Sequence, residues 1–336
     1  MSLIEIAKQC YNIYGFYPIS FSYCHPVEKT IPPKEKTLAT IVPGDFSTYI
    51  FHDESTYYKD YQKSKFGLTK CKGGWDCMRH LEILANRCLP LFENIESCPR
   101  YTMIHHPKEL YYEINQRKTE LENDPHLYET YVRKLTDHFN NHLTGEKMAE
   151  YILQVTGNEQ AQRVLFIDSK LASHFTDYLS MMIHNAFKMK FKQNCEVMYP
   201  GHNRFLYNDA TLNRHSMYGK GFSYAGKVPA EYRTDYEQAG IYQENRILEN
   251  IKNKFYDVII YGAYFYSSDH LPFIQQYYPK DKILGFHGGD NYIYDEEIKQ
   301  GVNNMTTFVR EPGRIRVWTN PQKTTYTAYQ EKMSLV

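Results

Sequence analysis

Residues 72–83 contain a glycine pair followed by charged residues whose spacing suits the binding of phosphate groups. Gly73 and Gly74 allow a ligand to approach the backbone closely, and they precede a predicted helix. The N-terminus of a helix presents free N–H groups and a partial positive charge, which favour an anion. We expect Arg79 to supply a forked donor for phosphate oxygens and Glu82 to accept hydrogen bonds from sugar hydroxyls. Together these residues predict a site for a nucleoside diphosphate.

The predicted helix has an apolar stripe and a separate polar face. The stripe follows the spacing i, i+4, i+7 and i+11, and its members are Cys77, Leu81, Leu84 and Cys88. Arg79, Glu82 and Asn86 share the polar face. An alternative interpretation remains open, because Arg79 and Glu82 also have the spacing of an ordinary surface ion pair, and the glycines can form a simple turn.

Three segments of this region, residues 64–69, 73–84 and 88–92, resemble the donor-binding half of exostosin-like glycosyltransferases. Those enzymes have the GT-B architecture, in which two Rossmann-like domains face each other. The resemblance covers about residues 37–115. It implies that Arg79 contacts the donor diphosphate and that Glu82 contacts the ribose. Many GT-B enzymes carry a second glutamate eight positions before the ribose-binding one. This chain has Gly74 there, so the resemblance assigns no residue to the donor contacts of that carboxylate.

The composition is that of a globular protein of about two domains. Of its 336 residues, 42% are hydrophobic and 23% are charged. Lys and Arg number 39 and so do Asp and Glu, which gives no basic field to attract nucleic acid or an anionic membrane. The 32 tyrosines suit stacking on sugars but equally suit core packing. Apolar runs are too short to span a bilayer, and the N-terminal residues do not resemble a secretory signal. The seven cysteines form no Cys-x-x-Cys pair, so we expect reduced cysteines, no disulfide framework and a cytoplasmic location.

Short apolar strands alternate with helices along both halves of the chain, which predicts an α/β fold with parallel sheets. In the first half the predicted strands are residues 38–42, 66–69, 89–92 and 101–104, and in the second half they are residues 163–168, 195–199, 257–262, 282–287 and 306–309. We expect residues 1–155 to form a donor domain and residues 156–336 an acceptor-side Rossmann-like domain, with the ligand in the cleft between them. Most GT-B enzymes have the opposite order. A permuted arrangement of the two domains would explain this difference, as would a fragment that spans two modules.

His287 and Asp290 follow a predicted strand in the second half, where open α/β sheets place their ligands. Glycosyl transfer needs a base that takes the proton of the acceptor hydroxyl, and Asp290 could be that base or could orient His287. The alternative is a turn in which Asp290 caps the next helix. The glycine-rich residues 218–222 lack the spacing of a Walker motif, and we expect them to lie over the interdomain cleft.

Taken together, the residues and the resemblance predict a sugar-nucleotide-dependent glycosyltransferase that acts on a glycan or another hydroxyl acceptor. The resemblance implies an inverting enzyme. The predicted donor site consists of Lys72, Gly73, Gly74, Asp76, Arg79 and Glu82, and the predicted catalytic residues are His287 and Asp290. There is no Asp-x-Asp signature, and the pair His105–His106 has no partner at metal-ligand spacing, so we expect neither a metal nor another cofactor. The alternative functions are an inactive glycan- or nucleotide-binding module of the same fold, or another enzyme that modifies sugar nucleotides.

Overall fold

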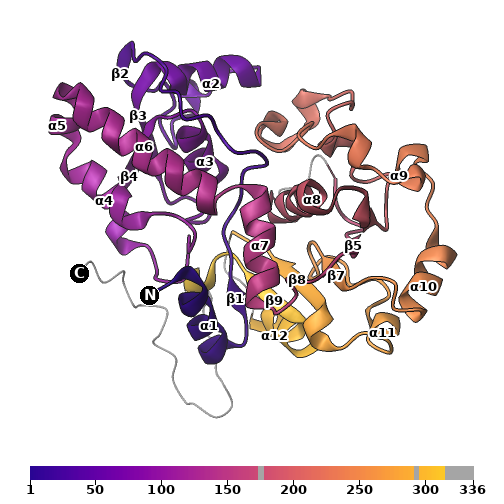
Figure 1. Ribbon diagram of the computed structural model, residues 1–336. Coiled ribbons are helices and arrows are strands. Elements are labelled where there is room, and N and C mark those ends of the chain that lie inside the picture. The colour runs from indigo at the N-terminus through magenta and orange to yellow at the C-terminus, as the bar shows by residue number, and fades with distance from the viewer. Residues whose placement is uncertain (173–177, 291–294, 315–336) are drawn as a thin grey trace.

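The computed structural model describes residues 1–172, 178–290 and 295–314, and it contains two parallel β-sheets (Figure 1). The six-stranded sheet has the order β1-β9-β8-β7-β5-β6, and the three-stranded sheet has the order β2-β3-β4. The large sheet contains β1 (Tyr17–Pro18), β5 (Val164–Ile167), β6 (Cys195–Val197), β7 (Val258–Tyr261), β8 (Ile283–His287) and β9 (Thr306–Val309). The small sheet contains β2 (Lys36–Leu38), β3 (Ser64–Lys70) and β4 (Leu89–Glu93). The prediction of an α/β fold with parallel sheets is therefore confirmed.

Helices fill the connections between the strands, as parallel sheets require. Their bounds are α1 (Leu3–Tyr14), α2 (Glu54–Lys63), α3 (Met78–Ala85), α4 (Lys108–Gln116), α5 (Lys118–Asn123), α6 (Pro125–His142), α7 (Gly145–Val155), α8 (Tyr178–Phe191), α9 (Asp235–Ala239), α10 (Glu244–Lys252), α11 (Leu271–Ile274) and α12 (Asp295–Asn304). Local sequence sets several of these boundaries. Asp124 caps α6 with its carboxylate and Pro125 occupies the first turn, while Ser2 and Glu5 form a capping box at α1. In the described part of the chain, none of the helices is both long and apolar enough to cross a bilayer.

The central strands of the large sheet are apolar throughout because both faces of the sheet are covered. In β5, Val164 and Phe166 point into a core shared with α7 and α8, whereas Leu165 and Ile167 pack with residues of α10 and α11 on the other face. Strands β6-β5-β7-β8-β9 follow the doubly wound order 2-1-3-4-5, in which ligands bind beyond the carboxyl ends of the strands.

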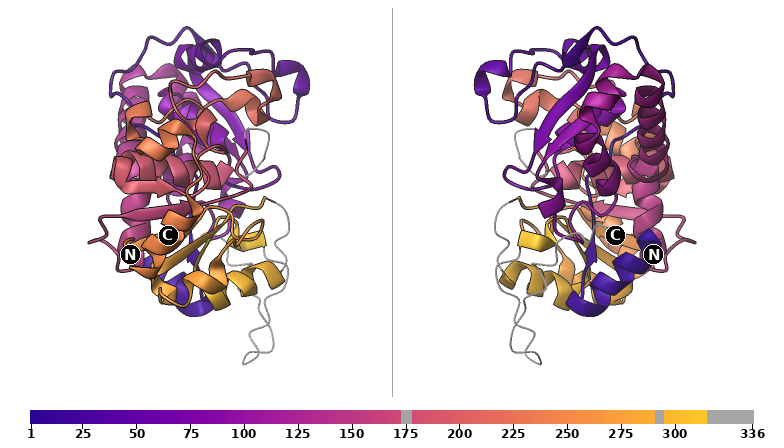
Figure 2. Two further views of the ribbon diagram at one scale, coloured as in Figure 1. Left: turned by 90° about the vertical axis from the view of Figure 1, so that its right-hand side faces the viewer. Right: turned by 90° about the vertical axis from the view of Figure 1, so that its left-hand side faces the viewer.

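One hydrophobic core runs through both sheets. Phe66 and Leu89 of the small sheet belong to the same buried cluster as Phe166 and Phe286 of the large sheet. We call the small sheet with α2, α3 and the adjoining loops the small lobe, and the large sheet with residues 178–290 and 310–311 the large lobe. Figure 2 shows the small lobe above the large sheet. Because the lobes share their core, the division into two GT-B domains remains a prediction.

The N-terminal segment crosses from the expected first domain into the large sheet. Tyr17 and Pro18 of β1 pair with Phe308 and Val309 of β9, and α1 packs on β1 and on α7. Residues 1–18 thus lie with the C-terminal half, although the expected boundary at residue 155 groups them with the small sheet. Figure 1 shows this segment, in indigo, beside the yellow strand β9.

Two predicted strands differ from the structure for local reasons. Residues 101–104 form turns rather than a strand, because the buried ammonium of Lys108 draws in the carbonyls of Pro99, Arg100 and Thr102 at 2.9–3.1 Å. The strand predicted at residues 38–42 ends at Leu38. Beyond it, the backbone N–H of Thr40 donates to the carboxylate of Asp60 at 2.8 Å instead of to a strand.

Candidate functional site

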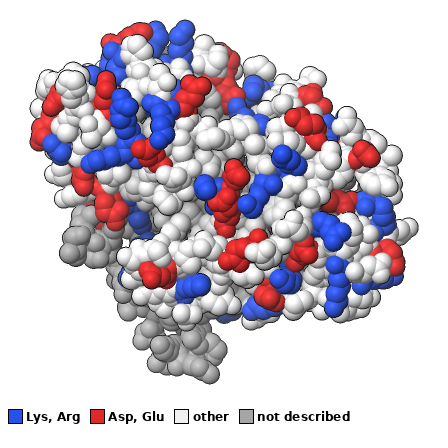
Figure 3. Space-filling model, viewed as in Figure 1, with Lys and Arg blue, Asp and Glu red and all other residues white. Residues whose placement is uncertain are grey.

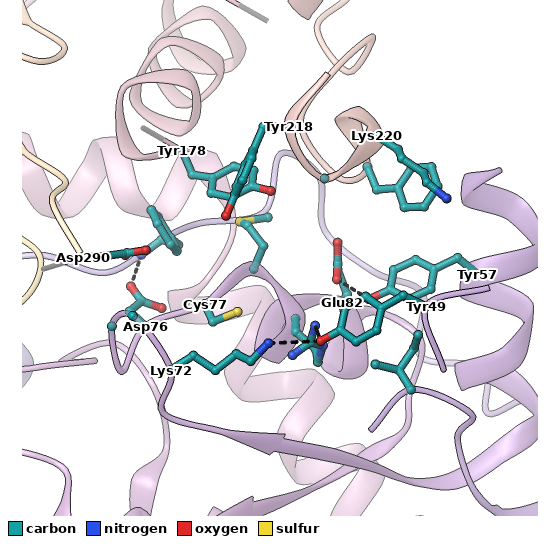
Figure 4. Close-up of a pocket in the computed structure, with 18 of the residues that line it drawn as sticks. Tyr49, Tyr57, Lys72, Asp76, Cys77, Glu82, Tyr178, Tyr218, Lys220 and Asp290 are labelled. Atoms are coloured by element: carbon teal, nitrogen blue, oxygen red, sulfur yellow. Dashed lines mark hydrogen bonds between the residues drawn. The ribbon is translucent and has the colours of Figure 1, made fainter. Parts of the chain in front are cut away.

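A cavity of about 680 Å³ opens where the loop after β3 meets the large lobe (Figure 4). The small lobe contributes Ile41, Phe46, Tyr49, Phe51, Tyr57 of α2, Glu82 and, from residues 72–79, all except Trp75. The large lobe contributes Tyr178, Tyr218, Gly219, Lys220, Phe222 and Asp290, and Phe21 completes the lining. The predicted donor residues Lys72, Gly73, Gly74, Asp76, Arg79 and Glu82 all line it. Tyr218, Gly219, Lys220 and Phe222 of the glycine-rich segment line this cavity, whereas the interdomain cleft over which we expected the segment to lie remains a prediction.

Arg79 presents a guanidinium to this cavity without a carboxylate partner. Its Nη2 donates to the hydroxyl of Tyr49 at 2.7 Å, and its guanidinium lies 5.3 Å from the centre of the Tyr49 ring. Within the described residues it forms no ion pair, and its buried Nε has no hydrogen-bond partner. The N-cap of α3 is Cys77, whose thiol is a poor substitute for the oxygen that usually caps a helix. A cation and a helix N-terminus therefore both face the cavity, and both favour an anion.

Glu82 does not pair with Arg79, so the surface ion pair that the spacing allowed is absent from the described structure. Its carboxylate is buried and accepts hydrogen bonds at 2.6 Å from the hydroxyls of Tyr57 and Ser223. Burial raises the pKa of Glu82 above its usual value. A carboxylate has about four acceptor positions, so two of them remain for a ligand.

Two of the three residues of the expected polar face of α3, Glu82 and Asn86, are buried because α2 covers them with matching polar groups, whereas Arg79 is half-buried at the cavity. Tyr57 of α2 reaches Glu82, and Gln62 donates to the side-chain oxygen of Asn86 at 2.9 Å. The expected stripe is also altered at its first member, since Cys77 is only half-buried and lines the cavity.

Asp76 lines the cavity, but its carboxylate is engaged by other groups of the protein. It accepts the backbone N–H of Phe21 at 2.5 Å and lies 3.3 Å from Nε2 of His106. Although burial opposes ionisation, His106 and the nearby Arg310 hold the pKa of Asp76 below its usual value. The backbone N–H of Asp76 donates to Glu311 at 2.8 Å, which anchors the glycine loop to the large lobe.

Gly74 is required by the protein itself and not only by an approaching ligand. A Cβ at this position would lie 2.5 Å from Oε1 of Glu311 and 3.1 Å from Nη1 of Arg310. Around Gly73 the neighbour is Asp290, whose Oδ2 would lie 3.1 Å from an added Cβ. The glycine pair thus lets the small lobe pack closely against charged side chains of the large lobe.

The structure brings Asp290 to the cavity but not His287. Asp290 lines the cavity and forms an ion pair with the buried Arg310. His287 is buried behind it, with Nε2 2.9 Å from Glu297 and its ring stacked on Phe265 at 4.3 Å between centroids. The alternative, in which Asp290 caps the following helix, involves residues 291–294, which lie outside the described chain.

Sequence reasoning missed most of the aromatic lining. The residues that it did not assign are Phe21, Phe46, Tyr49, Phe51, Tyr57 and Tyr178, whereas Tyr218, Lys220 and Phe222 belong to the segment that was expected over the cleft. Residues 41–51 carry no periodic pattern that would place them at a site. The excess of tyrosine was the single available signal, and it did not specify positions.

Charge over the face viewed in Figure 1 is evenly mixed, with acidic and basic side chains side by side (Figure 3). Among the described residues there is no group of three or more His, Cys, Asp or Glu side chains placed to hold a metal ion. Comparisons of the chain with protein-family models, with curated proteins and with solved structures found no match.

Proposed function

We propose that the cavity binds a nucleoside diphosphate sugar and that the protein transfers the sugar to a hydroxyl acceptor. The observation that carries this proposal is Arg79, a half-buried guanidinium at the start of α3 that faces a cavity and has no carboxylate partner among the described residues. A cation that is held by a tyrosine rather than by an acid keeps its charge available for a ligand anion. The cavity volume of about 680 Å³ lies in the range of about 300–1,000 Å³ that is usual for small-molecule sites.

The neighbouring residues suit the rest of such a ligand. Lys72 lines the same wall as Arg79, so that two cations can stabilise the charge on a diphosphate leaving group. Glu82 has acceptor capacity left for ribose hydroxyls. The aromatic rings of the cavity can stack on a base or a sugar.

The reaction would join the acceptor oxygen to the anomeric carbon while the bond from that carbon to the diphosphate oxygen breaks. The electron pair of the broken bond passes to the diphosphate, next to Arg79 and Lys72. The acceptor proton passes to a carboxylate, and we propose Asp290 for this role because, unlike His287, it lines the cavity. Its position beside Gly73 places it close to the wall assigned to the phosphates.

A binding module without catalysis is the second candidate. It is favoured by the ion pair between Asp290 and Arg310, since Arg310 already engages the carboxylate that would have to take up the acceptor proton. The two functions differ in a simple assay. A transferase should slowly hydrolyse its preferred sugar nucleotide without acceptor and should lose this activity as Asp290→Asn, whereas a binding module should show saturable binding and no hydrolysis.

Calorimetry with nucleoside diphosphates tests the site. Arg79→Ala should weaken binding by about 1.5–3 kcal/mol, the range for a charge-assisted hydrogen bond. Arg133→Ala is the matched control, because Arg133 is an exposed residue of α6 outside the cavity. Equal affinity of the wild type and Arg79→Ala, or no binding of any nucleoside diphosphate, would contradict the assignment.

A further inference from the structure

Lys220 lies in a backbone conformation that is unfavourable for lysine. Three consecutive residues are left-handed, with φ values of 55° at Gly219, 58° at Lys220 and 72° at Gly221. Glycine adopts this region freely, whereas the Cβ of a lysine makes it sterically unfavourable. Such strain persists only where the surroundings enforce it, and it is frequent at ligand sites.

The surroundings of this turn enforce its shape. Nη1 of Arg214 donates to the carbonyl of Lys220 at 3.1 Å, and the hydroxyl of Tyr224 donates to the carbonyl of Tyr218 at 2.8 Å. Gly219 lies so close to Tyr178 that an added Cβ would be 2.4 Å from the tyrosine hydroxyl. The turn therefore holds Lys220 at a fixed place on the cavity wall.

The ammonium of Lys220 has a partner but no counter-charge. It donates to the backbone carbonyl of Phe51 and lies 3.5 Å from Nδ1 of His52. It forms no ion pair with any carboxylate of the described residues. Because an ammonium has three N–H donors, donor capacity remains for a ligand.

The cavity has two chemically different ends. Figure 4 shows Lys72 and Lys220 at opposite ends, with Glu82 between them. Aromatic rings gather at the Lys220 end: Lys220 donates to the carbonyl of Phe51, the Phe51 ring lies 5.7 Å from Tyr57, and Tyr57 stacks on Phe222 with centroids 5.4 Å apart. A nucleotide whose phosphates lie at Lys72 and Arg79, and whose ribose lies at Glu82, would have its base at this aromatic end.

We infer that Lys220 selects the base of the nucleotide and that it favours uracil and guanine over cytosine and adenine. This inference rests on the proposed function. Uracil and guanine carry a carbonyl oxygen where cytosine and adenine carry an amino group. An ammonium can only donate, so it pairs with the carbonyl and leaves an amino group without a partner. A site built around a polar contact rejects a ligand that cannot make it.

Affinities for four nucleoside diphosphates test this inference. UDP carries a carbonyl oxygen on its base where CDP carries an amino group. GDP and ADP differ in the same way among the purines. The wild type should bind UDP over CDP, or GDP over ADP, by about ten- to hundredfold, the preference expected from one good base contact. Lys220→Met should lose most of this preference, because its affinity for the favoured nucleotide falls while its affinity for the other is nearly unchanged. Lys59→Met is the control, since Lys59 is exposed on α2 and does not line the cavity.

The outcomes separate this inference from the proposed function. A wild type that binds all four nucleotides equally overturns the role of Lys220 and leaves the nucleotide site intact. If Lys220→Met lowers the affinity for all four nucleotides by the same factor, Lys220 is purely structural, and its role in base selection is also overturned. A wild type that binds none of them overturns the proposed function. Lys220→Gln keeps a donor for the Phe51 carbonyl without the charge, so it supplies the measurement if Lys220→Met fails to fold.

Discussion

Ser223 donates its hydroxyl to Oε1 of Glu82 at 2.6 Å, and this hydrogen bond joins the two lobes at the wall of the cavity. The backbone N–H of Ser223 also donates to Glu54 at 2.7 Å, and Glu54 pairs with Lys227 at 2.8 Å. The residue that we assign to the ribose therefore also holds the large lobe. Ligand binding and the contact between the lobes share one carboxylate.

Ser223→Ala should destabilise the protein by about 1.5–3 kcal/mol, because it removes a buried hydrogen bond to a carboxylate. The free energy of unfolding in urea measures this change. Ser216→Ala is the control, since Ser216 is exposed and its hydroxyl donates to the carbonyl of Asn213 in its own turn at 3.0 Å. Equal losses in the two variants would show that the contact between Ser223 and Glu82 adds no stability.

Gly74→Ala should cost about 1–3 kcal/mol, the usual penalty for forcing extra volume into a packed site. The added methyl would meet Glu311 at 2.5 Å, and the buried Arg310 and Asp76 leave Glu311 little room to move. Gly201→Ala is matched to it, because a Cβ at Gly201 meets nothing within 4 Å. Thermal unfolding of both variants measures the difference, and a Gly74→Ala protein as stable as Gly201→Ala would contradict the close packing.

Elements whose signal is local could be predicted from the sequence. The apolar run of β5 and the Gly-Gly loop before α3 are specified within a few residues of chain, and both are present. The capping of α6 by Asp124 is equally local. These features depend on periodicity, turn residues and caps, which a single sequence displays.

Contacts between distant residues could not be predicted in this way. Gly74 packs against Glu311, and Glu82 accepts from Ser223, although each pair is far apart along the chain. The same limit explains why the burial of His287 away from the cavity was not predicted. A position at the end of a strand does not reveal whether the side chain faces a cavity or a neighbouring helix. The chemistry of residues 72–82 was visible in the sequence, whereas the partners that hold those residues were not.

Glu311 should make the stability of the protein depend on pH. Burial raises the pKa of this carboxyl from 4.5 to about 7. Between these values the folded protein keeps a proton that the unfolded chain has lost, so the free energy of unfolding falls as pH rises. The stabilising contribution is complete below pH 4.5 and is lost by about pH 7, a change of roughly 3 kcal/mol.

Glu311→Gln cannot titrate and should lack this change. We expect urea unfolding at several pH values between 4.5 and 7.5 to show that the free energy of unfolding of the glutamine variant increases relative to that of the wild type as pH rises. Glu96→Gln, at an exposed position, should follow the wild type throughout. Parallel profiles for the wild type and Glu311→Gln would exclude Glu311 as the titrating group.

Tyr49 should act on a bound diphosphate only through the cations that it holds. Its hydroxyl accepts from Arg79 at 2.7 Å and from Lys72 at 3.3 Å, and its ring lies 5.3 Å from the guanidinium of Arg79. Tyr49→Phe keeps the ring and removes the hydroxyl, so it should weaken nucleoside diphosphate binding by about 0.5–1.5 kcal/mol, the net value of a typical hydrogen bond. In an Arg79→Ala background most of this effect should disappear, because the shorter of the two contacts no longer exists. Calorimetry on the two single variants and the double variant gives the coupling free energy, and strictly additive losses would show that Tyr49 acts independently of Arg79.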